Sequence, residues 1–230
     1  MNKIYIFLAA LLVLSSYADD RVVVDLYYES LCPGCQNFIE TELTPAIHVE
    51  GFETIANIRL FPYGNAKTSS SKQVTCQHGT NECYGNILEA CAIAHIESSK
   101  TLEFITCVEN AIEDNNENFD KVSQLCYKNM NIPTADQVDV QACQTGSEGK
   151  QLLLNAGQAT DALNPPHKYV PWIVVNGQHT DDIQQQAQYD LVGYVCSLYT
   201  GPNQIAACKS YSRQFFKMFE FKLIEKCYKQ

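Results

Sequence analysis

Charge is scarce in this 230-residue chain, in which only 18% of the residues are Asp, Glu, Lys or Arg. Lys and Arg together number 16 against 26 acidic residues, so the formal net charge is −10. An acidic surface repels nucleic-acid backbones and anionic lipid, which argues against both as partners. There are only 3 methionines and 1 tryptophan, but hydrophobic residues make up 46% of the chain and suffice for a well-filled core.

The chain also lacks a hydrophobic run of the ~20 residues that a membrane-spanning helix needs. The apolar run Ile4–Leu14 is shorter, follows a lysine and precedes the small residues Ser16 and Ala18. This pattern predicts a secretory signal peptide at residues 1–18 and a mature chain that begins near Asp19. Because no Asn-x-Ser/Thr acceptor and no Lys-Asp-Glu-Leu-type ending occur, we expect neither N-glycosylation nor retention in the endoplasmic reticulum.

Cysteine, in contrast, is abundant, with 11 residues. So many cysteines suit an oxidising compartment, where structural disulfides persist. The count is odd, so full pairing of the others leaves one thiol over. We therefore expect a protein of the secretory pathway, located in lysosomes or endosomes or secreted.

The first part of the mature chain has the pattern of a βαβ unit. Residues 22–28 form a nearly continuous apolar run, which predicts a strand buried on both faces. Cys32-Pro33-Gly34-Cys35 follows, and then come apolar residues at helical spacing, namely Ile39, Leu43 and Ile47. Alternation over residues 56–60 predicts a second strand. The Cys-x-x-Cys motif therefore stands at the switch from strand to helix.

The segment from Cys76 to Cys143 has a different character. It contains six cysteines and apolar residues at helical spacing, which predicts three helices in a small subdomain held by disulfides. The α/β framework resumes near Glu148 with a predicted helix, one face of which carries Leu152, Ala156, Ala159 and Leu163. We expect one domain at residues 19–201 that contains this insertion at about residues 76–143.

The last part of the domain is predicted to contain a strand, a turn and a helix. Residues 169–175 form an apolar strand, and Asn176-Gly177 predicts a hairpin turn because both turn positions need positive φ. One amphipathic helix is expected over residues 187–198. Beyond it, the tail 202–230 is aromatic and basic and carries Cys208 and Cys227.

Cys32-Pro33-Gly34-Cys35 carries the main chemical signal. The N-terminus of a helix has partial positive charge and free N–H groups, which stabilise a thiolate at its first cysteine. The spacing lets the second sulfur reach the first. We therefore expect Cys32 to attack a disulfide and Cys35 to resolve the resulting mixed disulfide. An ordinary short-loop disulfide and half of a zinc site are the alternatives.

Val170-Pro171 stands just ahead of an apolar strand, well after the two cysteines in sequence. Thioredoxin-like folds hold a cis peptide bond beside the active sulfurs at such a position, and proline makes this form accessible at about 0.5–1 kcal/mol. Because proline lacks an N–H, neighbouring backbone groups are left to pair with an extended substrate segment. We expect a cis bond here and substrate binding by Val170 and Pro171; a trans proline at the start of a strand is the alternative.

The stretch from Cys76 to Cys91 is the most specific pattern in the chain. It matches CQHG-x2-EC-x2-N-x4-C, the signature of the gamma-interferon-inducible lysosomal thiol reductase family, at every fixed position: Cys76, Gln77, His78, Gly79, Glu82, Cys83, Asn86 and Cys91. The chain also resembles this family from the first strand through Tyr63-Gly64-Asn65-Ala66 and Val170-Pro171-Trp172 to residues 195–199. The resemblance thus covers nearly the whole mature chain.

The resemblance implies an α/β protein with a thioredoxin-like fold, in which the cysteine-rich helical insertion lies between a βαβ half and a C-terminal ββα half. It implies a soluble thiol reductase that breaks protein disulfides, best at acidic pH in endosomes and lysosomes, with Cys32 and Cys35 as the active pair. Precursors of the family can be secreted, can form disulfide-linked homodimers and are trimmed at both ends. The tail 202–230 resembles the removable C-terminal part. Without a glycan acceptor, lysosomal delivery and secretion both stay open.

The signature residues are expected to be mainly structural. We interpret Cys76, Cys83 and Cys91 as disulfide partners, although connectivity does not follow from spacing. His78 is a proton carrier or, with the neighbouring cysteines, a zinc ligand, but the spacing fits no common zinc finger and we expect no metal. Gly79 suits a turn with positive φ. Glu82 and Asn86 are expected to cap a helix or form hydrogen bonds within the insertion.

No cofactor is predicted. Residues 64–68 faintly resemble a phosphate-binding loop but lack the glycine next to lysine, and the chain has no flavin or nucleotide motif. A small thiol such as cysteine or glutathione must therefore re-reduce the pair. At pH near 5, an ordinary thiol with a pKa of about 8.5 is mostly protonated, so acidic operation requires a pKa of Cys32 lowered by several units. The alternatives are a secreted, non-enzymatic binding protein with a structural disulfide and a disulfide isomerase or oxidase.

Overall fold

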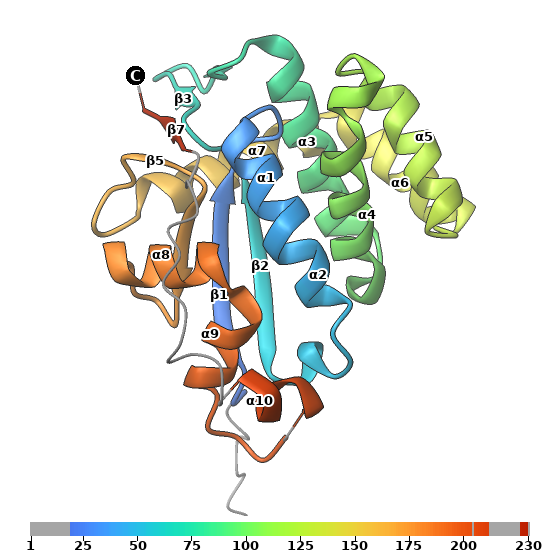
Figure 1. Ribbon diagram of the computed structural model, residues 1–230. Helices are drawn as coiled ribbons and strands as arrows, with labels where there is room; N and C mark the ends of the chain where they lie inside the picture. Colours follow the sequence, from blue (N-terminus) through green and yellow to red (C-terminus); the bar gives the residue numbers. More distant parts are fainter. Residues whose placement is uncertain (1–18, 204, 212–225, 230) are drawn as a thin grey trace, which may run out of the picture.

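The computed structural model describes residues 19–203, 205–211 and 226–229 (Figure 1). The predicted signal peptide, residues 1–18, lies outside the described residues. Three strands form the central sheet in the order β2-β1-β6: β1 (Val22–Tyr28), β2 (Ala56–Pro62) and β6 (Trp172–Val175). β2 runs parallel to β1, whereas β6 runs antiparallel to it. Both strands predicted for the βαβ unit are confirmed.

β1 is the central strand, and six of its seven residues are buried. A strand covered on both faces requires a continuous apolar run, which explains the Val- and Tyr-rich sequence. Asp25 is the buried exception, and the guanidinium of Arg59 in β2 binds its carboxylate through two hydrogen bonds of 2.5 and 2.6 Å. β2 is covered less completely, in agreement with its alternating sequence.

A helical segment connects β1 to β2. It consists of α1 (Pro33–Phe38), a π-helical turn η1 (Ile39–Leu43) and α2 (Thr44–Ile47), followed by a short 3-10 turn η2 (Phe52–Thr54). Ile39 and Leu43 are buried, as the predicted apolar stripe requires. Thr44 Oγ1 donates to the carbonyl oxygen of Ile39, so the π-helical turn ends where this side chain satisfies the backbone. In Figure 1 the segment lies in front of the sheet.

The insertion is helical, as predicted, but it holds one more helix than expected. Its helices are α3 (Thr80–His95), α4 (Ser98–Ala111), α5 (Phe119–Asn129) and α6 (Thr134–Thr145), with a 3-10 turn η3 (Glu113–Asn115) after α4. A two-stranded ribbon of β3 (Lys67–Thr68) and β4 (Val74–Thr75) precedes it. α6 was missed because it buries only Val140 and Cys143, which is too few residues for a visible stripe.

The framework resumes with α7 (Ser147–Asp161), as predicted. β5 (Tyr169–Val170) and β6 follow, and Asn176 and Gly177 form the predicted turn with φ of 49° and 76°. The returning strand of that hairpin is not formed beyond a single bridge between Val175 and Gln178. The reason is local: Thr180 caps the next helix at once, because its hydroxyl accepts from Ile183 N.

The single helix expected over residues 187–198 is two helices. α8 (Asp181–Tyr189) and α9 (Leu191–Leu198) are separated by Asp190, whose φ of −157° is extended. The Asp190 side chain accepts from Gly193 N and so caps the second helix. The prediction of one helix was therefore wrong, because the apolar spacing continues across a break that only the cap reveals.

Two pieces of the tail are described. α10 (Ala206–Tyr211) is tied to α9 by the Cys196–Cys208 disulfide. β7 (Cys227–Tyr228) lies beside β5 and pairs with it antiparallel. Figure 1 shows this last strand at the same end of the molecule as the start of α1.

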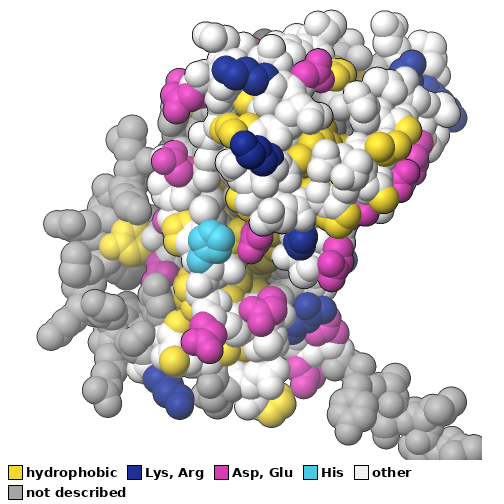
Figure 2. Space-filling view, turned by 90° about the vertical axis from the view of Figure 1, so that its right-hand side faces the viewer, with side chains coloured by type: hydrophobic (Ala, Val, Ile, Leu, Met, Phe, Trp, Pro, Cys, Tyr) yellow, Lys and Arg dark blue, Asp and Glu magenta, His cyan; other side chains and the backbone are white. Residues whose placement is uncertain are grey.

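The surface of the insertion is mixed in character. Figure 2 shows small separate hydrophobic areas on this side of the molecule, with acidic and basic side chains scattered among them. Leu125 and Val138 are the large apolar side chains that α5 and α6 leave exposed. Among the described residues, no helix combines the length and the apolar character that crossing a bilayer requires.

Candidate active site

Cys32 lies directly before α1. Its carbonyl oxygen accepts hydrogen bonds from the N–H groups of Cys35 (2.9 Å) and Gln36 (3.0 Å), as expected for the residue that begins a helix. Its sulfur lies 3.8 Å from the carbonyl oxygen of Val170, and the Val170–Pro171 peptide bond is cis. The predicted cis bond is confirmed, and the structure brings it next to the sulfur of Cys32.

The structure does not join Cys32 to Cys35. Cys32 forms a disulfide with Cys227, which is 195 residues away in sequence. Cys35 is the leftover thiol of the odd count, free among the described cysteines and fully buried. Burial, and then the charge of Glu29, raises the pKa of Cys35 well above its usual value. In this state Cys32 is oxidised and buried, and Cys35 is a neutral thiol.

Gln184, a buried residue of α8, holds the loop around the cis bond. Its side-chain Nε2 donates to the carbonyl oxygen of Pro171, and its Oε1 accepts from Ile173 N, both at 2.9 Å. This one amide therefore satisfies backbone groups on both sides of Trp172. Because α8 is anchored to the sheet in this way, the backbone that faces Cys32 is fixed in position.

The tail residues 226–229 cover this loop. Val170 pairs with Cys227 and Tyr169 pairs with Tyr228, and Lys229 N donates to the Lys168 carbonyl oxygen at 3.0 Å. The tail thus adds a short antiparallel strand to β5. The backbone groups that we expected to bind an extended segment are occupied by a segment of the same chain.

Glu29 follows the last residue of β1, and its side chain is completely buried. One carboxylate oxygen accepts from Asn65 N at 2.8 Å, whereas Oε1 has no hydrogen-bond partner among the described residues. A Glu29 oxygen and the sulfurs of Cys32 and Cys227 lie within 4.8 Å of one another. Burial, and then the charge of Glu82, raises the pKa of Glu29 to about 8, so this carboxyl is neutral at acidic pH.

Gly64 makes the approach of Glu29 to the backbone feasible. Its φ is +60°, and a Cβ at this position would lie 2.3 Å from Glu29 Oε2. Only glycine meets both demands without strain. The turn that presents Asn65 N to the carboxylate therefore depends on this residue.

His78 connects the buried carboxyl to the surface. Its Nδ1 shares a short hydrogen bond with Glu82 and lies 3.7 Å from Glu29 Oε1. The His78 side chain is 34% exposed, whereas both carboxylates are fully buried. Of the two roles considered for His78, this geometry favours the proton carrier.

A polar stripe runs along the buried face of α3. Glu82, Asn86 and Glu89 stand at i, i+4 and i+7, and all three are fully buried. Asn86 Oδ1 accepts a hydrogen bond from Ser30 N at 2.9 Å. We expected Asn86 to bond within the insertion, but this bond connects the insertion to the segment before Cys32. Glu89 accepts a short hydrogen bond from the hydroxyl of Tyr28 in β1.

Glu89 also interacts with Glu109 of α4 in the same interior. Burial raises the pKa of both carboxyls, and the charge of Glu89 adds to the effect on Glu109. Glu29, Glu109 and Glu82 all raise the pKa of Cys35, after desolvation. The interior behind the cysteines therefore contains three carboxyl groups whose pKa is raised by burial, those of Glu29, Glu89 and Glu109.

The signature cysteines are disulfide partners, in agreement with the interpretation from the sequence. Disulfides join Cys76 to Cys83 and Cys91 to Cys143, and a further one joins Cys107 to Cys126. Gly79 has φ of +94°, in agreement with the predicted turn. Glu82 does form a hydrogen bond within the insertion, because its Oε1 accepts from His78 N at 3.2 Å.

Three groups of side chains bring potential metal ligands within 4.8 Å of one another among the described residues. Two of them contain cysteines that are bound in disulfides and offer no thiolate. The third is Glu29 with His78 and Glu82. A zinc site built from His78 and its neighbouring cysteines is excluded in this state, because Cys76 and Cys83 are bonded to each other.

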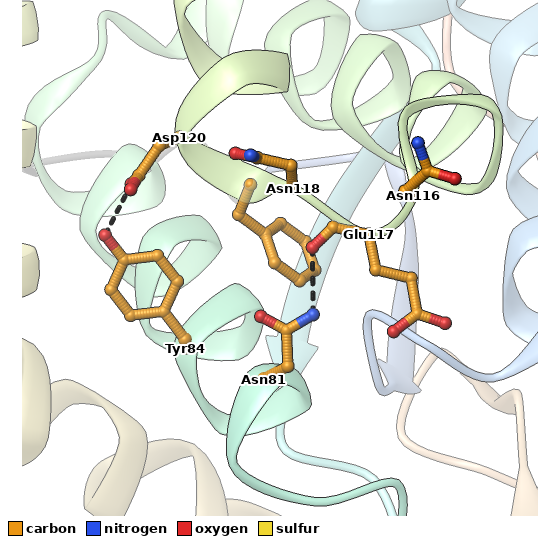
Figure 3. A pocket seen from close by; sticks show the side chains of 7 residues that line it. Asn81, Tyr84, Asn116, Glu117, Asn118 and Asp120 are labelled. Atoms are coloured by element: carbon orange, nitrogen blue, oxygen red, sulfur yellow. Dashed lines mark hydrogen bonds between the residues drawn. The ribbon is translucent and has the colours of Figure 1, made fainter.

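A polar hollow of about 340 Å³ lies elsewhere, between the start of α3 and residues 116–120 (Figure 3). Asn81 donates to the Glu117 carbonyl oxygen at 2.9 Å, and the Tyr84 hydroxyl donates to Asp120 at 2.6 Å. None of the predicted site residues lines this hollow. Its polar groups are bonded to one another across the two segments.

Sequence reasoning missed Glu29, Asn65, Glu89 and Gln184 as members of this site. A signal existed for two of them. Glu29 is an acidic residue directly after a buried strand, and Glu89 continues the spacing of Glu82 and Asn86 on an otherwise apolar helix. No local pattern pointed to Gln184, because its partners come from the backbone of a loop.

The chain is similar to known proteins over most of its length. A family model described as "Gamma interferon inducible lysosomal thiol reductase (GILT)" matches residues 23–130. The gamma-interferon-inducible lysosomal thiol reductase of Carassius auratus is 41% identical over 190 residues, which cover 81% of this chain and 72% of that protein. The gamma-interferon-responsive lysosomal thiol protein of Arabidopsis thaliana is 40% identical over 182 residues, or 79% of this chain and 72% of that one. The reductase of Mus musculus is 36% identical over 192 residues, with coverages of 82% and 72%. With this identity and coverage, the chain belongs to the gamma-interferon-inducible lysosomal thiol reductase family.

Proposed function

We propose that this protein is a thiol reductase that reduces protein disulfides by exchange at Cys32 and Cys35. The observation that carries the proposal is the environment of Cys32. Its sulfur stands at the start of a helix, 3.8 Å from the carbonyl oxygen that precedes cis-Pro171, and a buried thiol lies three residues further on. The Cys-x-x-Cys spacing allows this second sulfur to reach a disulfide at Cys32, and Cys35 is the free thiol available to open it.

The reaction takes two exchange steps. The Cys32 thiolate attacks one sulfur of the substrate disulfide, and the other substrate sulfur leaves as a thiolate that takes up a proton. Cys35 then loses its proton and attacks Cys32, which breaks the mixed disulfide and releases the second substrate sulfur. The substrate gains two electrons and two protons, and a Cys32–Cys35 disulfide remains. Two molecules of a small thiol such as cysteine or glutathione restore the pair and leave as one disulfide.

Glu29 is the group placed to move the proton in the second step. It lies within 4.8 Å of both sulfurs of the Cys32 disulfide, and its pKa of about 8 keeps it protonated under acidic conditions. The carboxyl gives its proton to the departing thiolate and takes the proton of Cys35, so its own state is restored. His78, bonded to Glu82 and 3.7 Å from Glu29, links this carboxyl to solvent.

This proton supply suits an acidic compartment. A carboxyl that is neutral below about pH 8 is a donor throughout the endosomal and lysosomal range, and the relatives from Carassius auratus and Mus musculus carry a lysosomal name. Lysosomal or endosomal action is therefore the compartment that we propose, with secretion as the second destination.

The decisive experiment compares the two partners of one disulfide. Cys32→Ser and Cys227→Ser each remove the Cys32–Cys227 bond, so their effects on folding are matched. We expect the Cys227→Ser protein to reduce insulin at pH 5 with cysteine as reductant, and the Cys32→Ser protein to be inactive. Equal activity of the two variants would refute the assignment of Cys32. A reduction potential of the Cys32–Cys35 pair below about −300 mV would instead favour a binding protein with a structural bridge.

A further inference from the structure

The tail segment 226–229 meets the site through side chains as well as through its backbone. The Asn65 amide Nδ2 donates to the Cys227 carbonyl oxygen at 3.1 Å, and Gln77 Nε2 donates to the Tyr228 carbonyl oxygen at 3.3 Å. Asn65 also donates to Gln77 Oε1 at 2.6 Å, so the two amides hold each other in place. Two consecutive carbonyl groups of the tail are thus received by a pair of linked amides.

The side chains of the tail separate onto two faces, as they do on any strand. Cys227 points toward Cys32, whereas Lys226 and Tyr228 share the opposite face. There the Tyr228 ring packs edge-on against Tyr169 with centroids 5.7 Å apart, and Lys226 Nζ lies 3.8 Å from the centre of the same ring. Tyr169 therefore serves as a platform for the residues on either side of the cysteine.

The contacts with the backbone do not depend on which chain supplies the strand. The Val170–Cys227 and Tyr169–Tyr228 pairs, together with the bond from Lys229 N to Lys168, join main-chain groups that any extended peptide possesses. A strand added to an exposed edge gains affinity from such pairs, and pockets for alternate side chains give specificity.

We infer that residues 226–229 occupy the substrate site as a substrate does. The Cys32–Cys227 bond is then an internal copy of the mixed disulfide, and Asn65, Gln77 and Tyr169 are substrate-binding residues. The preferred substrate is an extended segment with a basic residue before its cysteine and an aromatic residue after it. This inference rests on the proposed function, because it describes the substrate of that same site.

The tail leaves by the chemistry that releases a substrate. The Cys35 thiolate attacks the Cys32 sulfur, the bond to Cys227 breaks, and Cys227 departs as a thiolate that takes up the proton. A Cys32–Cys35 disulfide is formed, so the number of disulfides does not change in this step. Two molecules of a small thiol then reduce the new pair and are oxidised to one disulfide.

The first test measures how firmly the tail is held. The full-length protein is equilibrated in glutathione buffers of increasing reducing strength, quenched with acid and alkylated, and the free fraction of Cys227 is read by mass spectrometry. We expect Gln77→Ala and Asn65→Ala each to free Cys227 at a glutathione ratio about fivefold less reducing, the size expected for one hydrogen bond. Asn155→Ala, which removes an exposed amide on α7, is the control and should cause no change.

The second test uses substrates in the Cys227→Ser protein, in which Cys32 is not bonded to the tail. We compare kcat/KM for the disulfide of the tetrapeptide Lys-Cys-Tyr-Lys, for that of Gly-Cys-Gly-Gly and for hydroxyethyl disulfide. The kcat/KM for the Lys-Cys-Tyr-Lys disulfide should exceed that for the Gly-Cys-Gly-Gly disulfide at least fivefold. Gln77→Ala should lower the ratio of kcat/KM for Lys-Cys-Tyr-Lys to that for hydroxyethyl disulfide by about fivefold.

The outcomes separate the two proposals. One outcome against the inference is that hydroxyethyl disulfide is reduced but the two peptides have the same kcat/KM. Another is that Gln77→Ala loosens the tail without changing the ratio of kcat/KM for Lys-Cys-Tyr-Lys to that for hydroxyethyl disulfide. In either case the tail has a site of its own and the inference is wrong. If no disulfide is reduced at all, the proposed function fails, and the inference fails with it.

Discussion

A carboxylate oxygen of Glu29 lies within 4.8 Å of the sulfur of Cys32. The two residues are the first and the last of the short link between β1 and α1, so the sheet that buries the carboxyl also places the sulfur. Oε1 of Glu29 has no hydrogen-bond partner among the described residues, and it is the oxygen that lies 3.7 Å from His78 Nδ1.

Glu29→Gln should slow the reaction and alter its pH profile. The amide keeps the shape and the neutral state of the side chain but cannot give up a proton. General acid–base catalysis contributes roughly 10²-fold or more, so we expect kcat for insulin reduction at pH 5 to fall by about that factor. The decline of the wild-type rate near pH 8, where Glu29 ionises, should disappear. Glu40→Gln, an exposed carboxyl of η1, is the matched control, and a wild-type profile for Glu29→Gln would contradict the relay.

Folding stability should depend on the same carboxyl. Its pKa is about 8 in the folded protein against an ordinary value of 4.5, so its contribution to stability is complete below pH 4.5 and is lost as the pH rises through 8. Glu29→Gln should therefore raise Tm relative to wild type at pH 8 but not at pH 4.5, as measured by calorimetry without reductant. His167 works in the opposite sense, because burial lowers its pKa to about 4 and its contribution is lost as the pH falls from 6.5 through that value. An equal change in Tm at both pH values would contradict the assignment to Glu29.

In the full-length, unreduced chain the two cysteines of the Cys-x-x-Cys motif should not be bonded to each other. We expect one alkylated cysteine after denaturation without reductant, at Cys35, and a cross-linked peptide that contains Cys32 and Cys227. In the native state Cys35 should react slowly, because it is buried and its pKa is raised. A peptide map with Cys32 joined to Cys35 and a free Cys227 would contradict the structure.

Cys35→Ser should trap intermediates. Without the internal thiol, the Cys32 mixed disulfide cannot be resolved within the chain, so a covalent complex with insulin should accumulate in the Cys227→Ser background. Non-reducing gel electrophoresis shows the complex, and addition of a dithiol should dissolve it. Trapping by Cys32→Ser instead would reverse the roles of the two cysteines.

Gly64→Ala should destabilise the protein more than Gly177→Ala. Both glycines have positive φ, at 60° and 76°, so each substitution carries a conformational cost of about 1–2 kcal/mol. Only at Gly64 does a Cβ also collide with Glu29, at 2.3 Å from Oε2, whereas nothing lies within 4 Å of a Cβ at Gly177. The free energy of unfolding from denaturant titrations should fall by a further ~2 kcal/mol or more at Gly64. Equal losses would show that the contact with Glu29 is not held in solution.

Much of the framework could be predicted from the sequence, because its signals are local. The apolar run of β1, the alternation of β2 and the Asn176-Gly177 turn each follow from the properties of neighbouring residues. The break at Asp190 and the helix α6 were missed, because one depends on a cap and the other on very little burial. The cis bond at Pro171 was expected from the resemblance to thioredoxin-like folds, which hold one before a strand and well after the two cysteines; position alone would have favoured a trans proline.

The site was predictable only in part, because its decisive contacts join distant segments. Cys32 and Cys35 were predicted as the reactive pair from four adjacent residues, but the structure joins Cys32 to a partner 195 residues away. Disulfide connectivity depends on the three-dimensional fold, and spacing does not encode it. Glu29 and Asn65 meet across 36 positions, so neither one alone marks the site.

The Cys196–Cys208 and Cys32–Cys227 bonds secure the tail at two points, and the chain between residues 209 and 226 bridges them. Hydrolysis of any peptide bond in that bridge leaves Cys227 attached to Cys32 through sulfur, and reduction alone leaves the tail tethered nearby at high local concentration. Detachment of the segment that carries Cys227 therefore requires two different events, cleavage of that bridge and opening of the Cys32–Cys227 bond, in either order. A molecule that undergoes only one of them keeps the segment covalently attached.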